Sequence, residues 1–124
     1  MKLLLDTHAL IWALEGSRRL SAVARAMLEN TDNLVLVSAV SAWEIAIKTA
    51  LKRLEVPGDL IEAIDDAGFL RRPLGFLEAK RLAALPHHHQ DPFDRMLIAH
   101  ALEEGASLVT HDEQIAKYNV AIVW

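Results

Sequence analysis

Short apolar runs separated by longer helical segments are the feature that most restricts how this chain can fold. The runs are Lys2 to Leu5, Leu34 to Val37, Ser107 to Thr110 and Ala121 to Val123, with Phe69-Leu70 as a fifth. Runs of this length show no useful periodicity, but continuous apolar character is typical of parallel strands buried on both faces. Their alternation with helices predicts an α/β fold with a largely parallel sheet.

The segments between the runs have the start and stop signals of helices. We expect helices at residues 9–14, 21–29, 38–54, 60–67, 77–85 and 92–104, and a helical turn at 112–116. The helix after Ser38 has Trp43, Ile47 and Leu51 on one apolar arc. An apolar arc of this kind normally faces the core. For Trp43 we expect a place either in the core or in a dimer interface.

Composition fits a single compact domain over residues 1–124. Hydrophobic residues make up 52% and charged residues 24%, which excludes a disordered chain. The chain has no cysteine, which suits a reducing compartment, and no apolar stretch approaches the roughly 18 residues of a membrane span. We therefore expect a cytoplasmic protein with no membrane partner. The formal net charge of −4 argues against nucleic-acid binding, unless a cation neutralises several of the acids.

One carboxylate occupies a position that should be apolar. Asp91 is a favourable N-cap, and Pro92 suits the first position of the helix that follows. At about 100° per residue, Asp94 falls on the same arc as Leu97 and Ile98, which should face the core. Burying an ionised carboxylate without a partner costs several kcal/mol. A cation should therefore meet Asp94.

Four acids should meet at one end of the sheet. Asp6 and Asp112 follow two of the apolar runs. Asp94 lies in the first turn of its helix, and Glu44 lies in the second turn of its own. Sites in parallel sheets form at the carboxyl ends of the strands. Four carboxylates there would repel one another without a cation, and oxygen ligands favour Mg²⁺ or Mn²⁺. Removing four charges from −4 leaves a neutral chain, so the objection to nucleic acid weakens. The pattern indicates phosphoryl chemistry with a metal-activated water.

Each acid also has a purely structural explanation that the sequence leaves open. Asp6 and Asp112 could cap the helical segments that follow them. Glu44 could pair with Lys48 at i, i+4. Asp94 could complete a capping box or simply favour the helix dipole at the start of its own helix.

Four segments give the chain its resemblance to a known family. They read LDTHALIW at 5–12, SAVSAWEI at 38–45, DPFDRMLIA at 91–99 and VTHD at 109–112. In these segments the chain resembles the PIN-domain ribonucleases, specifically the VapC toxins of type II toxin–antitoxin systems. The resemblance implies a three-layer α/β/α sandwich with a mainly parallel, roughly five-stranded sheet. It implies an endoribonuclease that needs Mg²⁺ or Mn²⁺. It also implies a homodimer and a small cognate antitoxin that occludes the site.

The resemblance assigns roles to individual positions. The catalytic and metal-binding acids would be Asp6, Glu44, Asp94 and Asp112. The hydroxyl residues that support them would be Thr7 and Thr110. Candidates for contact with RNA or antitoxin are Arg95, Lys48 and His8, with a solvated or packed surface role as the alternative. The roles of His87, His88 and His89 stay open.

Two other function classes compete with a nuclease. A catalytically silent PIN module would bind RNA or protein without turnover. A phosphoacceptor receiver-like domain has a similar length and alternation of strands and helices. That domain needs paired acids after its first strand, whereas Asp6 stands alone.

Overall fold

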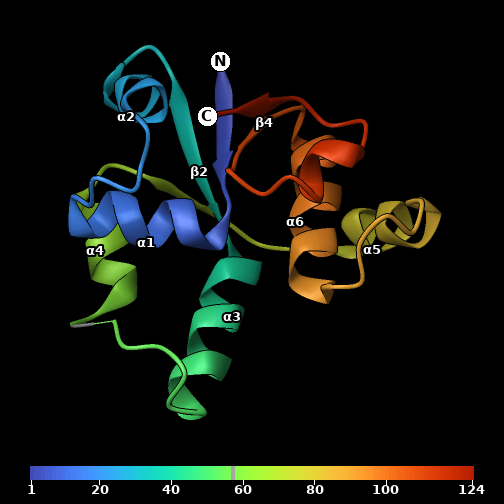
Figure 1. The fold of residues 1–124 in the computed structure, drawn as a ribbon, viewed down its shortest axis with the longest axis horizontal. Coiled ribbons are helices and arrows are strands. Elements are labelled where there is room, and N and C mark those ends of the chain that lie inside the picture. Colours follow the sequence, from blue (N-terminus) through green and yellow to red (C-terminus); the bar gives the residue numbers. More distant parts are fainter. Residues whose placement is uncertain (57) are drawn as a thin grey trace.

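Strands and helices alternate along the computed structural model, which describes residues 1–56 and 58–124 (Figure 1). The strands are β1 (Lys2–Leu5), β2 (Leu34–Ser38), β3 (Leu70–Arg72), β4 (Ser107–Val109) and β5 (Ile122–Val123). The helices are α1 (Thr7–Glu15), α2 (Ala22–Glu29), α3 (Ala39–Ala50), α4 (Leu60–Asp66), α5 (Phe76–Ala84) and α6 (Pro92–Glu104), with a 3-10 turn at Ile115–Lys117. The predicted α/β alternation is confirmed.

The first strand lies at the centre of the sheet. The strand order is β3-β2-β1-β4-β5, and each pairing between these strands is parallel. Leu5 is level with Val37 on one neighbour and with Val109 on the other. The chain first builds outward from β1 to β3 and later builds β4 and β5 on the opposite side. The strand order therefore reverses between β1 and β4, and the carboxyl ends at such a switch point leave a crevice for a ligand.

Helices cover both faces of the sheet (Figure 1). On one face, Leu3 and Leu5 belong to a core cluster with residues of α1, α2 and α4. On the other face, Leu4 clusters with residues of α6, and α5 packs against the outer side of α6. Successive side chains of β1 thus enter opposite cores, which explains its uninterrupted apolar sequence. The three-layer α/β/α sandwich and the parallel five-stranded sheet are confirmed.

The third helix differs from its prediction in both length and orientation. It ends at Ala50, short of the expected end near residue 54. Three side chains of its apolar arc are exposed and do not enter the core, namely Trp43, Ile47 and Leu51. The inward contacts come from Val40 and Ile45, near the start of the helix. Figure 1 shows the reason, because α3 extends beyond the carboxyl ends of the strands and its second half has no sheet to cover.

The bounds of two shorter elements also differ from those expected. The third strand starts at Leu70 and ends at Arg72, slightly later than the apolar pair at 69–70 indicated. The helical turn expected from residue 112 is a 3-10 turn that begins at Ile115. Among the described helices, none combines the length and the apolar character needed to cross a bilayer.

Candidate active site

A cavity of about 280 Å³ opens beyond the carboxyl ends of β1 and β4. Its lining contains the four acids expected from the sequence, namely Asp6, Glu44, Asp94 and Asp112. Lys48 and His8 line it as well. A larger hollow of about 550 Å³ beside α2 contains none of these acids. The fold therefore brings together residues from four separate segments at the switch point of the sheet.

Asp6 has a structural bond and also faces the cavity. Its Oδ1 accepts a hydrogen bond from the Ala9 amide at 2.7 Å, which caps α1. Burial raises the pKa of this carboxyl, although hydrogen bonds from the Thr110 hydroxyl and the Ala9 amide act to lower it. Thr110 is itself buried, and its hydroxyl accepts a bond from the Asp112 amide at 3.1 Å. Thr110 therefore links the two acids that follow neighbouring strands.

Glu44 is buried at the start of α3, and both of its oxygens have partners. Oε1 accepts a bond from the Thr7 hydroxyl at 2.6 Å, and Oε2 lies 2.5 Å from the Lys48 ammonium. The Ser41 hydroxyl lies 3.1 Å from that of Thr7, to which it can donate. The structural pair expected between Glu44 and Lys48 is present. A cation in the cavity would share Glu44 with Lys48 or displace it.

Two aspartates at the start of α6 have different environments. Asp91 caps the helix, and its Oδ1 accepts bonds from the Phe93 and Asp94 amides at 2.9 and 3.1 Å. The Asp94 side chain is 20% exposed. Burial, followed by the negative charges of Asp91 and Asp112, raises the pKa of Asp94 to about 7. The predicted division between a capping acid and an inward-facing acid agrees with these contacts.

His89 provides the partner that Asp94 requires. Its Nε2 lies 3.0 Å from the Asp94 Oδ2 and 3.7 Å from the Asp112 Oδ2. Its Nδ1 accepts a bond from the Asp91 amide at 3.1 Å, which keeps a proton on Nε2. Ligand atoms of His89, Asp94 and Asp112 lie within 4.8 Å of one another. Because Nε2 carries a proton, His89 acts as a hydrogen-bond donor to these acids and not as a metal ligand.

Arg95 anchors the loop that carries His89. Its Nη1 donates to the Pro86 carbonyl at 2.7 Å and to the Tyr118 hydroxyl at 3.0 Å. The His89 amide donates to the same hydroxyl at 2.9 Å. Arg95 is buried and is not part of the cavity lining. The structure thus corrects the expectation that Arg95 contacts RNA or antitoxin, because its guanidinium is used inside the protein.

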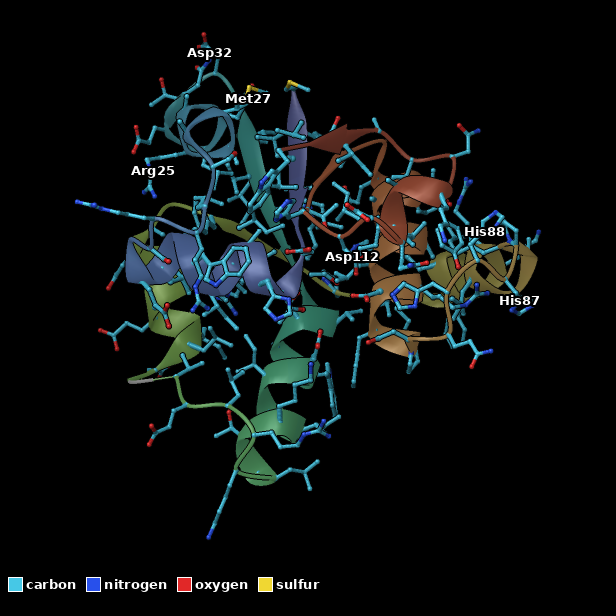
Figure 2. All side chains as sticks on the ribbon, in the orientation of Figure 1. Arg25, Met27, Asp32, His87, His88 and Asp112 are labelled. Carbon is cyan, nitrogen blue, oxygen red and sulfur yellow. The ribbon has the colours of Figure 1, made fainter. Side chains whose placement is uncertain are left out.

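Sequence reasoning did not separate His89 from its two neighbours. Figure 2 shows His87 and His88 out beside α5, whereas Asp112 lies in the space between α1, α3 and α6. The His88 ring packs edge-on against Tyr118, with 5.1 Å between ring centroids. A loop has no fixed period, so the three histidines could not be given directions from their spacing.

Comparison with known proteins begins with a family match over most of the chain. The PIN domain matches residues 3–121, a span that contains all four acids. Ribonuclease VapC22 of Mycobacterium tuberculosis is 30% identical over 118 residues, which covers 93% of this chain and 90% of the relative.

Solved structures share the fold at lower identity. VapBC2 from Rickettsia felis, bound to a DNA fragment from its promoter, matches with a TM-score of 0.73 and 14% identity, over 98% of this chain and 97% of that chain. DNA-bound VapBC from Salmonella typhimurium matches with a TM-score of 0.70 and 15% identity, over 98% of this chain and 96% of that chain. FitAcB from Neisseria gonorrhoeae matches with a TM-score of 0.60 and 18% identity, over 97% of this chain and 95% of that chain. With this fold, the family match and the 30% identical relative, the chain belongs to the PIN domain family.

Proposed function

We propose that this protein is a metal-dependent endoribonuclease and the toxin of a type II toxin–antitoxin pair. The observation that carries the proposal is the meeting of four carboxylates in one cavity at the switch point of the sheet. Membership of the PIN domain family supports it, as does similarity to a protein named as a ribonuclease. Because the chain belongs to the PIN domain family, it is not a phosphoacceptor receiver-like domain.

The donor set of the cavity suits a hard divalent cation, Mg²⁺ or Mn²⁺. Carboxylate oxygens are the ligands that these ions prefer. Burial and the neighbouring acids together raise the pKa of Asp94, and a bound cation would lower it. Asp6 and Asp94 would hold the ion, and Glu44 and Asp112 would complete the set directly or through water. When bound, such an ion supplies a Lewis acid and lowers the pKa of a water.

The residues of the chain orient the acids and the substrate for hydrolysis. Thr7 fixes Glu44, and His89 fixes Asp94, through the hydrogen bonds described above. Lys48 and His8 line the cavity, where each can contact a phosphate of the RNA. In the proposed reaction a water oxygen forms a bond to phosphorus. The bond from phosphorus to a ribose oxygen breaks, and that oxygen takes up a proton.

Cleavage of RNA by the purified protein tests the proposal. We expect cleavage with Mg²⁺ or Mn²⁺, none with chelator, and a loss of more than about 100-fold in Asp6→Asn and Asp94→Asn, since even indirect partners of metal ligands typically contribute 10- to 100-fold. Asp32→Asn is the matched control, because Asp32 lies beside α2, far from the cavity (Figure 2). Cleavage by both site variants at the wild-type rate would contradict the assignment.

The proposal includes an antitoxin, a homodimer and a cytoplasmic location. VapBC complexes among the structural neighbours support an antitoxin partner. Exposed apolar side chains on α3 and α5, among them Trp43 and Phe76, offer surfaces for protein contacts. The absence of cysteine agrees with a reducing compartment.

One observation favours the silent binding module as a second candidate. Lys48 and His89 already pair with Glu44 and Asp94 without any metal. A module of this kind would bind RNA tightly and leave it intact with every divalent ion tested. The cleavage assay above distinguishes the two functions.

A further inference from the structure

We propose that an aromatic wall beside the acids binds an unpaired nucleobase of the RNA, next to the phosphate that is cut. The wall consists of His8, Trp12 and His111, which line the acid cavity, with Trp124 behind them. The inference rests on the proposed function. It adds to that function a surface that would hold one base of the substrate beside the acids.

The rings of the wall form one continuous set. The centroids of His8 and Trp12 are 5.6 Å apart, and those of Trp12 and Trp124 are 5.8 Å apart in an edge-to-face arrangement. His111 stacks on Trp124 with 5.0 Å between centroids and 3° between ring planes. These contacts fix the orientation of each ring before any ligand arrives. A rigid aromatic surface costs little conformational entropy when it binds another ring.

The wall is anchored at its base and open at its rim. Trp12 and Trp124 are partly buried and pack against the core cluster of β1, α1 and α2. His8 and His111 are exposed. His8 and Trp12 occupy positions i and i+4 of α1, so they lie on the same face of that helix. Rings that only filled the core would not need exposed aromatic neighbours on the cavity side.

The wall continues directly into the acid site. His8 is two positions after Asp6, and His111 immediately precedes Asp112. The charge of His8 acts to lower the pKa of Asp6, which reflects how near the two groups are. A phosphate held at the acids would therefore have its attached nucleoside beside the rings.

A nucleobase is the part of RNA that suits this surface. Single-stranded RNA is commonly recognised by bases that stack on aromatic side chains, and histidine is one of these. Bases in a duplex are already paired and stacked, so they could not reach the wall. Stacking uses the ring face that every base has, so the wall selects single strands more strongly than it selects one base.

Abasic RNA tests the contact once the cut position on a single-stranded RNA is mapped. We expect removal of the base at one nucleotide beside the cut to lower kcat/KM of the wild type by about 5- to 100-fold, the loss that one base–aromatic stack causes. In Trp12→Ala and in His111→Ala the same abasic change should cost much less. His111 is exposed, so this variant keeps the test valid if Trp12→Ala does not fold.

A matched control is Trp43→Ala, because Trp43 is 68% exposed and does not line the cavity. This variant should keep the full abasic penalty. An equal penalty in wild type, Trp12→Ala and His111→Ala would overturn the inference while leaving the nuclease intact. Equal cleavage of duplex and single-stranded RNA would also overturn it.

Tryptophan fluorescence separates failure of the wall from failure of the proposed function. The chain has three tryptophans, so Trp43→Phe leaves only the two in the wall as reporters. With Mg²⁺ or Mn²⁺, single-stranded RNA should quench this emission, and the abasic RNA should quench it less. If no RNA is cleaved under any condition, the nuclease fails; base-dependent quenching would still support the wall, and equal quenching by both RNAs would overturn it.

Discussion

At the scale of single residues, one histidine and one threonine orient two of the acids in this site. His89 donates to Asp94 while its other nitrogen is held by the Asp91 amide. Thr7 holds Glu44 in the same way from the start of α1. Neither side chain needs to touch RNA to matter, because each restricts the rotamer of a carboxylate that lines the cavity.

In the absence of metal, Asp94 should make the protein less stable as pH rises from about 4 to about 7. Burial and neighbouring acids raise its pKa to about 7 from 3.8, so the folded state binds this proton more tightly than the unfolded chain. The contribution is fully present below the unfolded pKa and is lost as pH rises through the folded one. Urea unfolding in chelator measures this contribution as the difference in free energy of unfolding between the wild type and Asp94→Asn.

The stability of the wild type relative to Asp94→Asn should therefore fall across this pH window and stay constant above it. Saturating Mg²⁺ should flatten the difference, because a bound cation favours the ionised carboxylate. A difference that is independent of pH in chelator would show that Asp94 has an ordinary pKa.

His89→Ala should weaken Mn²⁺ binding or cleavage by about 10- to 100-fold, the usual cost of removing a group that orients a metal ligand. Mn²⁺ affinity, measured by electron paramagnetic resonance, reports the effect independently of activity. His88→Ala is the control, because its ring packs on Tyr118, whereas the His89 ring contacts Asp94. Equal losses of Mn²⁺ affinity in His89→Ala and His88→Ala would contradict the positioning role of His89.

The positions of Asp91 and Asp94 could be predicted from sequence, whereas that of His89 could not. Helix geometry fixes the angle between residues, so an acid on an apolar arc is visible as soon as the helix is recognised. His89 lies in a loop whose path depends on Tyr118, 29 positions further along the chain. No local pattern records such a contact.

At the scale of elements, the loop before α6 depends on one hydroxyl. The Tyr118 side chain is buried, and it accepts bonds from the Arg95 guanidinium and the His89 amide. It therefore connects the 3-10 turn after β4 to the start of α6. The His89 imidazole reaches Asp94 only while this connection holds the loop.

Tyr118→Phe should lower the free energy of unfolding by about 1–3 kcal/mol, because it leaves a buried charged donor short of an acceptor. Cleavage should fall as well, since the loop then holds His89 less firmly. Urea unfolding measures the first effect. Lys117→Ala, at the exposed neighbouring position, should change stability by no more than about 0.5 kcal/mol. A neutral Tyr118→Phe would mean that water replaces the hydroxyl.

Elements differ in how well the sequence predicts them. The strand β1 is recognisable from sequence because Leu3, Leu4 and Leu5 are buried on its two faces and form an apolar run. The orientation of α3 could not be predicted from its apolar arc, because an apolar stripe shows that a helix has an interface but not which surface covers it. Trp43 and Ile47 lie beyond the sheet edge and face outward.

At the scale of the whole molecule, the exposed apolar side chains lie apart from the acid cavity. Phe76, the first residue of α5, is 95% exposed, and the adjacent Leu77 is 64% exposed. Such side chains on the outer helix of the sandwich are costly in water. In the proposed homodimer, a second copy of the chain would cover them.

Phe76→Glu should convert the proposed homodimer into a monomer, because a charge would be buried in the contact. Light scattering coupled to size-exclusion chromatography measures the mass directly. Val23→Glu is the control, since Val23 is an apolar residue of α2 with 59% exposure. A wild type that is monomeric, or a Phe76→Glu variant that stays dimeric, would contradict the role of α5.

The central place of β1 has a consequence for synthesis of the protein. A nascent chain that has reached the end of α6 already contains Asp6, Glu44 and Asp94, yet β1 still lacks its neighbour β4, and Asp112 has not been made. Domains generally fold as units during translation. The acid cavity of the proposed nuclease is therefore incomplete on the growing polypeptide until translation has passed β4 and Asp112.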